Sequence, residues 1–206
     1  MYLLQLLISA LTAMIAIVVH EFSHGYVAYL MGDYSAKQDG RLSFNPLRHL
    51  DFVGVICLIF FKIGWAKPVP VNPYMFKNRK KGIVYVSLAG VVSNFILAVF
   101  SIIFMCFLYN QNTLYVQILY LFFYNLAAVN IGLGVFNLIP IPPLDGSKVL
   151  AQLLPMQTRI KYLNFERYGG LLLFVLIYFG NLSRYLNIAL TYIFQLLFNI
   201  IAGVIL

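Results

Sequence analysis

The sequence predicts an all-α, multi-pass membrane protein with about five transmembrane helices, a short re-entrant hairpin and a small β-strand element after the first helix. Of the 206 residues, 62% are hydrophobic and 10% are charged, whereas soluble domains carry about 25% charged residues. The mean hydropathy is +0.88. The apolar residues form long runs, and about 20 apolar residues in a row suffice for a helix to cross a bilayer. The length fits one domain, residues 1–206, with a core at about residues 3–150 and C-terminal helices at about residues 162–206.

The first third of the chain predicts one span followed by shorter elements. The span at residues 3–31 ends at Gly32, a common type of helix stop. Residues 40–44 alternate polar and apolar side chains before a turn signal, which predicts a short strand. Residues 52–63 are apolar, but a run of about 12 residues is too short to cross the bilayer as a helix. Residues 67–73 contain three prolines, which fix φ and remove N–H donors, so we expect an extended segment.

The basic residues bear on whether residues 52–63 cross the membrane. If this run crossed, the basic residues on its two sides would face opposite sides of the bilayer. A re-entrant hairpin keeps nine of the 14 Lys and Arg together on the cytoplasmic side and puts the N-terminus outside. These nine are Lys37, Arg41, Arg48, Lys62, Lys67, Lys77, Arg79, Lys80 and Lys81. A crossing remains the alternative. Because the charges lie in loops between apolar runs, the net charge of +8 does not indicate a nucleic-acid partner.

The remaining apolar runs predict four further spans. Residues 83–109 lead to a loop at 110–113 that lacks basic residues, as expected of an outer loop. Residues 114–139 return inward, and that helix breaks at a cluster of three prolines. Residues 162–181 and 185–206 form the last two predicted spans.

The first predicted span contains the sequence His20-Glu21-Phe22-Ser23-His24, a match to the pattern H-E-x-x-H. Residues four apart share one face of a helix, so the imidazoles of His20 and His24 can bind a single Zn²⁺. Glu21 is then placed to take a proton from a water at the metal. Ionisable groups within a membrane span are costly, and this favours a functional role. The alternative is that neighbouring helices merely satisfy these polar groups.

A zinc site of this type needs a third protein ligand, often a carboxylate, and the chain has six acidic residues. Asp33 and Asp39 lie in the loop after the first span, where solvated or capping roles are common. Glu166 begins a helix, where it stabilises the helix dipole. Asp145 follows a helix broken by prolines, and non-helical backbone at membrane depth typically lines a wet cavity. Capping of the next helix explains Asp145 equally well, and the spacing alone does not choose between the two.

Two motifs of this chain resemble those of the site-2 protease family of intramembrane zinc metalloproteases, also known as M50-like peptidases. They are H-E-F-S-H at residues 20–24 and N-L-I-P-I-P-P-L-D-G-S-K-V-L at residues 137–150. The intervening segments G-R-L-S-F-N-P-L-R-H-L-D-F-V-G, G-W-A-K-P-V-P-V-N-P and A-G-V-V-S-N are also similar to segments of that family. The resemblance covers about residues 19–150.

The resemblance implies a role for six polar residues. The implied ligands of one zinc ion per chain are His20, His24 and Asp145. Glu21 would activate the water, and Asn137 and Asn94 would lie near the site, in contact with the substrate or the oxyanion.

The chain also departs from the family pattern at two positions. Val91 stands where the family usually has proline. Phe52, which follows Asp51, also stands where the family usually has proline after an aspartate. Both positions concern the local backbone near Asn94 and His49. For His49 we expect an imidazole at the level of the lipid headgroups rather than a catalytic group.

The function implied by the resemblance is that of a zinc metalloendopeptidase acting within the membrane. It would cleave membrane-anchored proteins or signal-peptide remnants near the inner leaflet, in regulated intramembrane proteolysis, without a PDZ or CBS domain. The expected setting is a prokaryotic cell membrane, with the site toward the cytoplasm. The expected partners are the lipid bilayer and a transmembrane or membrane-associated peptide substrate. We expect residues 40–44 and 67–73 to hold the substrate extended by strand addition. Rival functions are a metal carrier, which predicts further ligands in other spans, and an inactive homologue that only binds membrane helices. No residue specifies the substrate, the cleavage site, a regulatory partner or the oligomeric state.

Overall fold

The computed structural model is helical over the part of the chain that it describes, namely residues 2–49, 51, 54, 67–109 and 113–205. Four helices among these residues are long and apolar enough to cross a membrane. They are α1 (Tyr2–Leu30), α4 (Arg79–Leu108), α5 (Leu114–Asn137) and α9 (Leu182–Ile205). The protein is therefore a multi-pass membrane protein by the length and composition of its helices.

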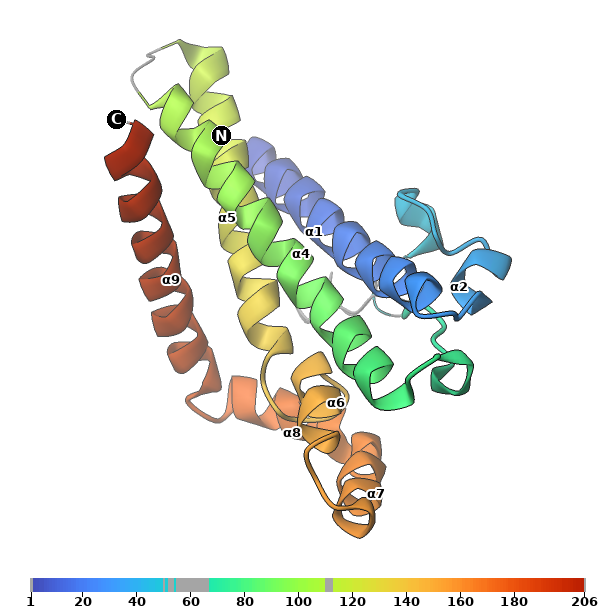
Figure 1. Cartoon of the computed structure of the whole chain (residues 1–206). Coiled ribbons are helices and arrows are strands. Elements are labelled where there is room, and N and C mark those ends of the chain that lie inside the picture. The colour runs from blue at the N-terminus through green and yellow to red at the C-terminus, as the bar shows by residue number, and fades with distance from the viewer. Residues whose placement is uncertain (1, 50, 52–53, 55–66, 110–112, 206) are drawn as a thin grey trace.

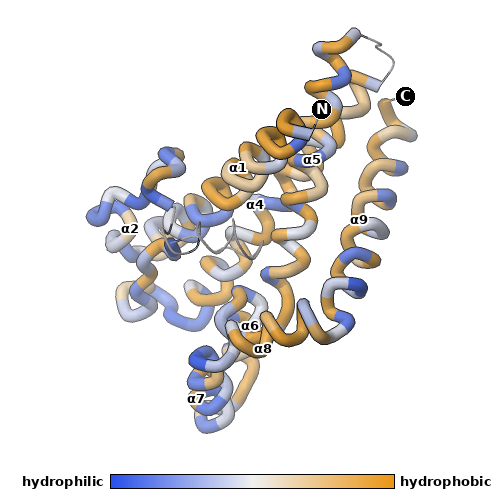
Figure 2. Tube along the Cα trace, turned by 180° about the vertical axis from the view of Figure 1, so that it is seen from behind, coloured by the Kyte–Doolittle hydropathy of each residue, from blue (hydrophilic) through white to orange (hydrophobic). Residues whose placement is uncertain are grey.

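The helices α1, α4 and α5 pack against one another, and α9 packs on α4 and α5 (Figure 1). Small residues allow the close approach, since Ala16, Ala98 and Ala127 are fully buried. Phe194 and Phe198 of α9 pack on the cluster that contains Ala127. Hydrophobic residues predominate along the four long helices, whereas hydrophilic residues gather around α2 and α7 (Figure 2).

Shorter helices lie between the long ones. They are α2 (Ser35–Gln38), η1 (Pro46–Arg48), η2 (Pro73–Met75), α6 (Asp145–Ala151), α7 (Met156–Asn164) and α8 (Glu166–Tyr178). Asn45, Asn72 and Asn78 cap η1, η2 and α4, because each side-chain oxygen accepts a backbone N–H of the first turn. The helices α6 to α8 lie at one end of the bundle, opposite the N-terminal end of α1 and the C-terminal end of α9 (Figure 1).

The predicted β-strand at residues 40–44 is wrong, and the described residues contain no strand. The chain turns here, because Gly40 has a φ of +63°. The N–H of Arg41 donates to the carbonyl of Ala36 at 2.8 Å, and the N–H of Ser43 donates to the carbonyl of Arg41 at 2.9 Å. Local hydrogen bonds of this kind use the backbone groups that a strand would need for pairing.

The predicted span at residues 162–181, the fourth in chain order, is also wrong. This stretch is divided near Phe165 into the end of α7 and the separate helix α8. With 13 residues, α8 is about 20 Å long and too short to cross a hydrocarbon core of about 30 Å. The structure therefore has four candidate spans among its described residues, and they correspond to the other four predicted spans. Except for Gly54, the predicted hairpin at residues 52–63 lies outside the described residues.

Residues 67–72 belong to no helix or strand, and we call them the 67–72 segment. The Arg41 guanidinium donates to the carbonyl of Pro68 at 3.1 Å. Asp33 is fully buried and accepts the N–H of Asn72 at 2.6 Å. Both charged side chains belong to the loop after α1, so this loop fixes the 67–72 segment at its two ends.

Two adjacent glycines in α8 test how this helix packs. A Cβ atom on Gly169 would overlap the carbonyl oxygen of Pro142, whereas one on Gly170 would meet nothing within 4 Å. We expect Gly169→Ala to destabilise the protein by about 1–3 kcal/mol, the usual cost of overpacking. Gly170→Ala is the matched control and should stabilise it by up to about 1 kcal/mol through helix propensity. Thermal unfolding in detergent micelles measures both, and equal midpoints for the two variants would contradict the packing described here.

Candidate metal centre

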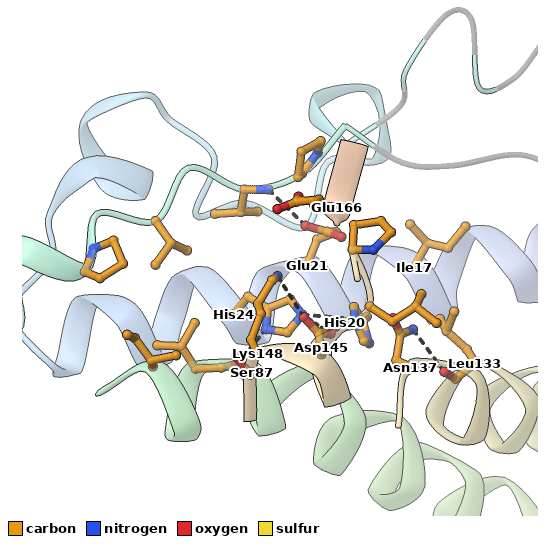
Figure 3. Close-up of a pocket in the computed structure, with 18 of the residues that line it drawn as sticks. Ile17, His20, Glu21, His24, Ser87, Leu133, Asn137, Asp145, Lys148 and Glu166 are labelled. Carbon is orange, nitrogen blue, oxygen red and sulfur yellow. Dashed lines mark hydrogen bonds and ion pairs between the residues drawn. The ribbon is translucent and has the colours of Figure 1, made fainter. Parts of the chain in front are cut away.

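Three buried side chains from two distant parts of the chain converge where α6 begins. The Nε2 atoms of His20 and His24 lie 3.0 Å apart. The Oδ2 atom of Asp145 lies 3.2 Å from the first of these nitrogens and 3.0 Å from the second. All three residues are buried, with exposed fractions between 4% and 8%. Figure 3 shows the two imidazoles on α1 facing the carboxylate at the start of α6.

The other ring nitrogen of each histidine is used in a hydrogen bond to α4. His24 Nδ1 donates to the carbonyl of Val86 at 2.6 Å, and a carbonyl can only accept. His20 Nδ1 faces Oδ1 of Asn94, also at 2.6 Å. Each Nδ1 therefore carries the hydrogen, and each Nε2 presents a lone pair toward Asp145.

This donor set fits a small divalent cation. Two lone pairs and a carboxylate oxygen at 3.0–3.2 Å repel one another unless a positive centre lies among them. A proton taken up by one ring would relieve only part of this repulsion, whereas a metal ion would contact all three atoms. In a tetrahedral zinc site with bonds of about 2.0–2.1 Å, neighbouring ligand atoms lie about 3.3 Å apart. The observed spacing is close to that value.

The second oxygen of Asp145 has its own partner. Lys148, one turn further along α6, places its Nζ atom 3.1 Å from Oδ1. Burial raises the pKa of the Asp145 carboxyl, whereas the ammonium group of Lys148 lowers it by favouring the charged form. The carboxylate is therefore an anion whose Oδ2 atom remains directed at the imidazoles.

The proline-rich turn between α5 and α6 brings Asp145 to the histidines. A Cβ atom on Gly146 would overlap the carbonyl of Leu138, so glycine allows the turn to fold back on the end of α5. The hydroxyl of Tyr162 donates to the carbonyl of Pro140 at 2.7 Å and supports the turn from α7. The turn thus places the buried Asp145 carboxylate against the two imidazoles.

Glu21 lies beside the three converging side chains, in a cavity of about 660 Å³ that all four residues line. Its Oε2 atom accepts the N–H of Val69 at 3.0 Å. Val69 belongs to the 67–72 segment, so the loop after α1 holds this backbone donor against Glu21. Figure 3 shows the Glu21 carboxylate directed into the cavity.

The remaining residues predicted for the site occupy different places. Asn137 is half-buried, lines the cavity and donates to the carbonyl of Leu133 at 3.0 Å (Figure 3). Asn94 is fully buried behind His20 and bonds to its ring. His49 is fully buried rather than interfacial as we expected, and its Nε2 atom bonds to the carbonyl of Ser43 at 2.7 Å.

Four residues of this region were not predicted from the sequence. Lys148 could have been found, because its i,i+3 spacing places it on the face of Asp145. Glu166 was assigned only to the start of a helix, yet it also lines the cavity. Gly90 lies so close that a Cβ atom would meet the His20 ring at 2.5 Å. Asn130 bonds to Asn94 and gave no separate signal among the apolar residues of α5.

Comparison with known proteins supports the family resemblance that the motifs indicated. The family model described as Peptidase family M50 matches residues 109–179, a stretch that contains Asp145. YwhC of Bacillus subtilis, named as a candidate zinc metalloprotease, is 40% identical over 170 residues, which cover 81% of this chain and 78% of YwhC.

More distant relatives carry the same kind of name. Rip2 of Mycolicibacterium smegmatis is 29% identical over 84% of this chain and 67% of its own length. Rip2 of Mycobacterium tuberculosis is 28% identical over 71% of this chain and 57% of its own length. No solved structure matches the chain. The similarity to YwhC extends over most of both proteins, and the chain therefore belongs to peptidase family M50, as its resemblance to the site-2 proteases implied.

Proposed function

We propose that this protein is a zinc metalloendopeptidase that cleaves peptide bonds within or at the edge of the membrane. The observation that carries the proposal is the convergence of two imidazole Nε2 atoms and one carboxylate oxygen beside Glu21, in a cavity of about 660 Å³. The metalloprotease names of the relatives support the reaction class. The apolar helices around the cavity support a membrane location.

His20, His24 and Asp145 would hold the zinc ion, one per chain. When bound, zinc acts as a Lewis acid and lowers the pKa of a coordinated water. Glu21 accepts a proton from the attacking water and returns it to the leaving amine. The N–H of Val69 binds one oxygen of the Glu21 carboxylate and thereby orients the other. Asn137 lines the same cavity, where its amide can donate to the substrate carbonyl as negative charge develops.

The substrate must be extended at the cleaved bond, because a helical carbonyl is already bonded to an N–H four residues along the chain. The 67–72 segment is our candidate for holding it. Residues of this segment line the cavity, and its backbone is fixed by Arg41 and Asp33. An extended peptide can add to such an edge through backbone hydrogen bonds. Residues 40–44, which are not a strand, take no part in this proposal.

The proposed substrates are transmembrane or membrane-associated peptides, including signal-peptide remnants, and the proposed process is regulated intramembrane proteolysis. The excess of basic residues in the loops near α2 and η2 supports a cytoplasmic site in a prokaryotic cell membrane, with the N-terminus outside. A metal carrier would need further ligands along the other spans. Among the described residues, His20, His24 and Asp145 form the one group that could hold a metal ion, which favours the protease.

The role of Glu21 as proton acceptor can be separated from metal binding. Glu21→Gln keeps the shape of the side chain but removes the base. We expect the purified variant to retain its zinc and to cleave a model membrane peptide about 10²- to 10⁴-fold more slowly than the wild type. Zinc content by atomic absorption and cleavage in detergent test this. Undiminished cleavage by the variant would rule out Glu21 as the base.

The proposed role of Asp145 as third ligand predicts a loss of bound zinc, which Glu21→Gln should not cause. We expect Asp145→Ala to reduce the zinc content from about one ion per chain to a small fraction, because two imidazoles alone bind weakly. Asp39→Ala removes an exposed carboxylate and serves as the control. If the Asp145 variant kept the zinc content of this control, another group would have to complete the coordination.

Substrate addition to the 67–72 segment predicts an effect of proline at Val71. No hydrogen bond of the Val71 N–H is found among the described residues, so that N–H is available to a substrate. Val71→Pro removes the donor and should lower kcat/KM by about tenfold, the cost of one lost hydrogen bond at a binding edge. Val71→Ala keeps the donor and controls for the side chain. Equal kcat/KM values for the two variants would exclude a role for this N–H.

A further inference from the structure

Two fully buried asparagines connect α5 to the metal centre through α4. Asn94 and Asn130 are both 0% exposed, in helices that otherwise bury mainly apolar residues. A buried amide without hydrogen bonds destabilises the fold, so each polar atom of such a residue needs a partner. The partners of these two residues determine which way each amide faces.

The direction of the hydrogen bonds follows from two backbone carbonyls. Asn130 Nδ2 donates to the carbonyl of Leu126 at 2.7 Å, so Oδ1 of Asn130 points the other way, toward α4. Asn94 Nδ2 donates to that oxygen at 2.6 Å and to the carbonyl of Ala16 at 3.2 Å. Because carbonyls only accept, the nitrogen of Asn94 must lie on this side, and its oxygen faces His20.

We propose that Asn130 is a positioning residue of the metal centre, which acts through Asn94 on His20. This inference rests on the proposed function, since it assumes that His20 binds the metal. The Asn94 oxygen accepts the N–H at Nδ1 of His20, and this leaves Nε2 free of hydrogen and able to act as a ligand. Without the oxygen of Asn130, the Asn94 amide loses the shorter of the two hydrogen bonds that fix its orientation and keeps only the bond of 3.2 Å to the carbonyl of Ala16.

If the Asn94 amide were reversed, His20 could not act as a ligand through Nε2. With Nδ2 of Asn94 facing His20, the ring nitrogen Nδ1 would have to accept, and the hydrogen would move to Nε2. His24 does not depend on such a relay, because its Nδ1 donates to a backbone carbonyl, that of Val86. The two imidazoles are thus oriented by different means, and α5 controls only one of them.

Asn130→Leu removes the acceptor, and α5 offers a matched control. Asn125 also donates to the carbonyl four residues before it, that of Leu121 at 2.8 Å, but it is not part of this network. Asn125→Leu therefore loses the same kind of helix contact without affecting Asn94. Asn130→Asp keeps an acceptor at the Oδ1 position, because a protonated carboxyl can donate to the helix carbonyl and accept from Asn94. Asn130→Ser, whose hydroxyl is too short to reach Asn94, provides a second loss variant if the leucine variant does not fold.

Zinc affinity of the purified full-length chain, measured by competition with a chelator, tests the proposal. We expect Asn130→Leu and Asn130→Ser to bind zinc about 10- to 100-fold more weakly than the wild type. Asn125→Leu and Asn130→Asp should bind within a few-fold of the wild type. The visible absorption spectrum of the Co²⁺-substituted protein should change in the two loss variants only, since it reports the ligand geometry.

A double-mutant cycle separates a relay through Asn94 from general loss of stability. If Asn130 acts through Asn94, the Asn94→Leu/Asn130→Leu double variant binds zinc no more weakly than Asn94→Leu alone. Additive losses, or equal zinc affinities of Asn130→Leu and Asn125→Leu, would overturn the proposal. A wild-type protein that did not bind zinc at all would overturn the proposed function instead.

Discussion

The structure depends on keeping two imidazole nitrogens and one carboxylate oxygen within 3.0–3.2 Å of one another. Without a positive centre these atoms repel, so the surrounding helices must hold them in place. The two histidines are held by α1 and α4. Asp145 is held by a turn that α7 and α8 support, through Tyr162 and through the close contact of Gly169 with Pro142. The segments after α6 therefore help to hold this group of atoms in place although they supply none of the three converging side chains.

The helix α4 serves as the platform for the histidines. Val86, Gly90 and Asn94 are four residues apart and share one face of this helix. Val86 accepts from His24, Gly90 makes room for the His20 ring, and Asn94 bonds to the same ring. The two helices run in opposite directions, because higher residue numbers in α4 meet lower numbers in α1. The spacing of the H-E-x-x-H motif thus has a counterpart on the neighbouring helix, and both are needed to direct the two lone pairs to one point.

The sequence predicted what depends on local periodicity and missed what depends on long-range contacts. Four apolar runs matched the four long helices, and the i,i+4 spacing predicted that His20 and His24 share one helix face, where their Nε2 atoms lie 3.0 Å apart. For Asp145 the spacing left capping as an equal alternative, and only the resemblance favoured a ligand. The predicted span at residues 162–181 failed because hydropathy reports composition, whereas the break near Phe165 accompanies contacts of α7 and α8 with the proline turn. The predicted strand at residues 40–44 failed because alternation of polar and apolar side chains also occurs in a folded loop that bonds to itself.

Polar residues within apolar helices are candidates for function, but the sequence does not tell them apart. Asn94, Asn125 and Asn130 all interrupt apolar runs, and each donates to a main-chain carbonyl. What distinguishes them is the helix face on which they lie, because only Asn94 and Asn130 meet across the contact between α4 and α5. The same holds for the loop after α1, where Asp33 and Arg41 look like ordinary solvated charges. Their burial against the 67–72 segment fixes the N–H of Val69, and through it Glu21. The orientation of the Glu21 carboxylate therefore depends on two charged side chains that lie outside both motifs.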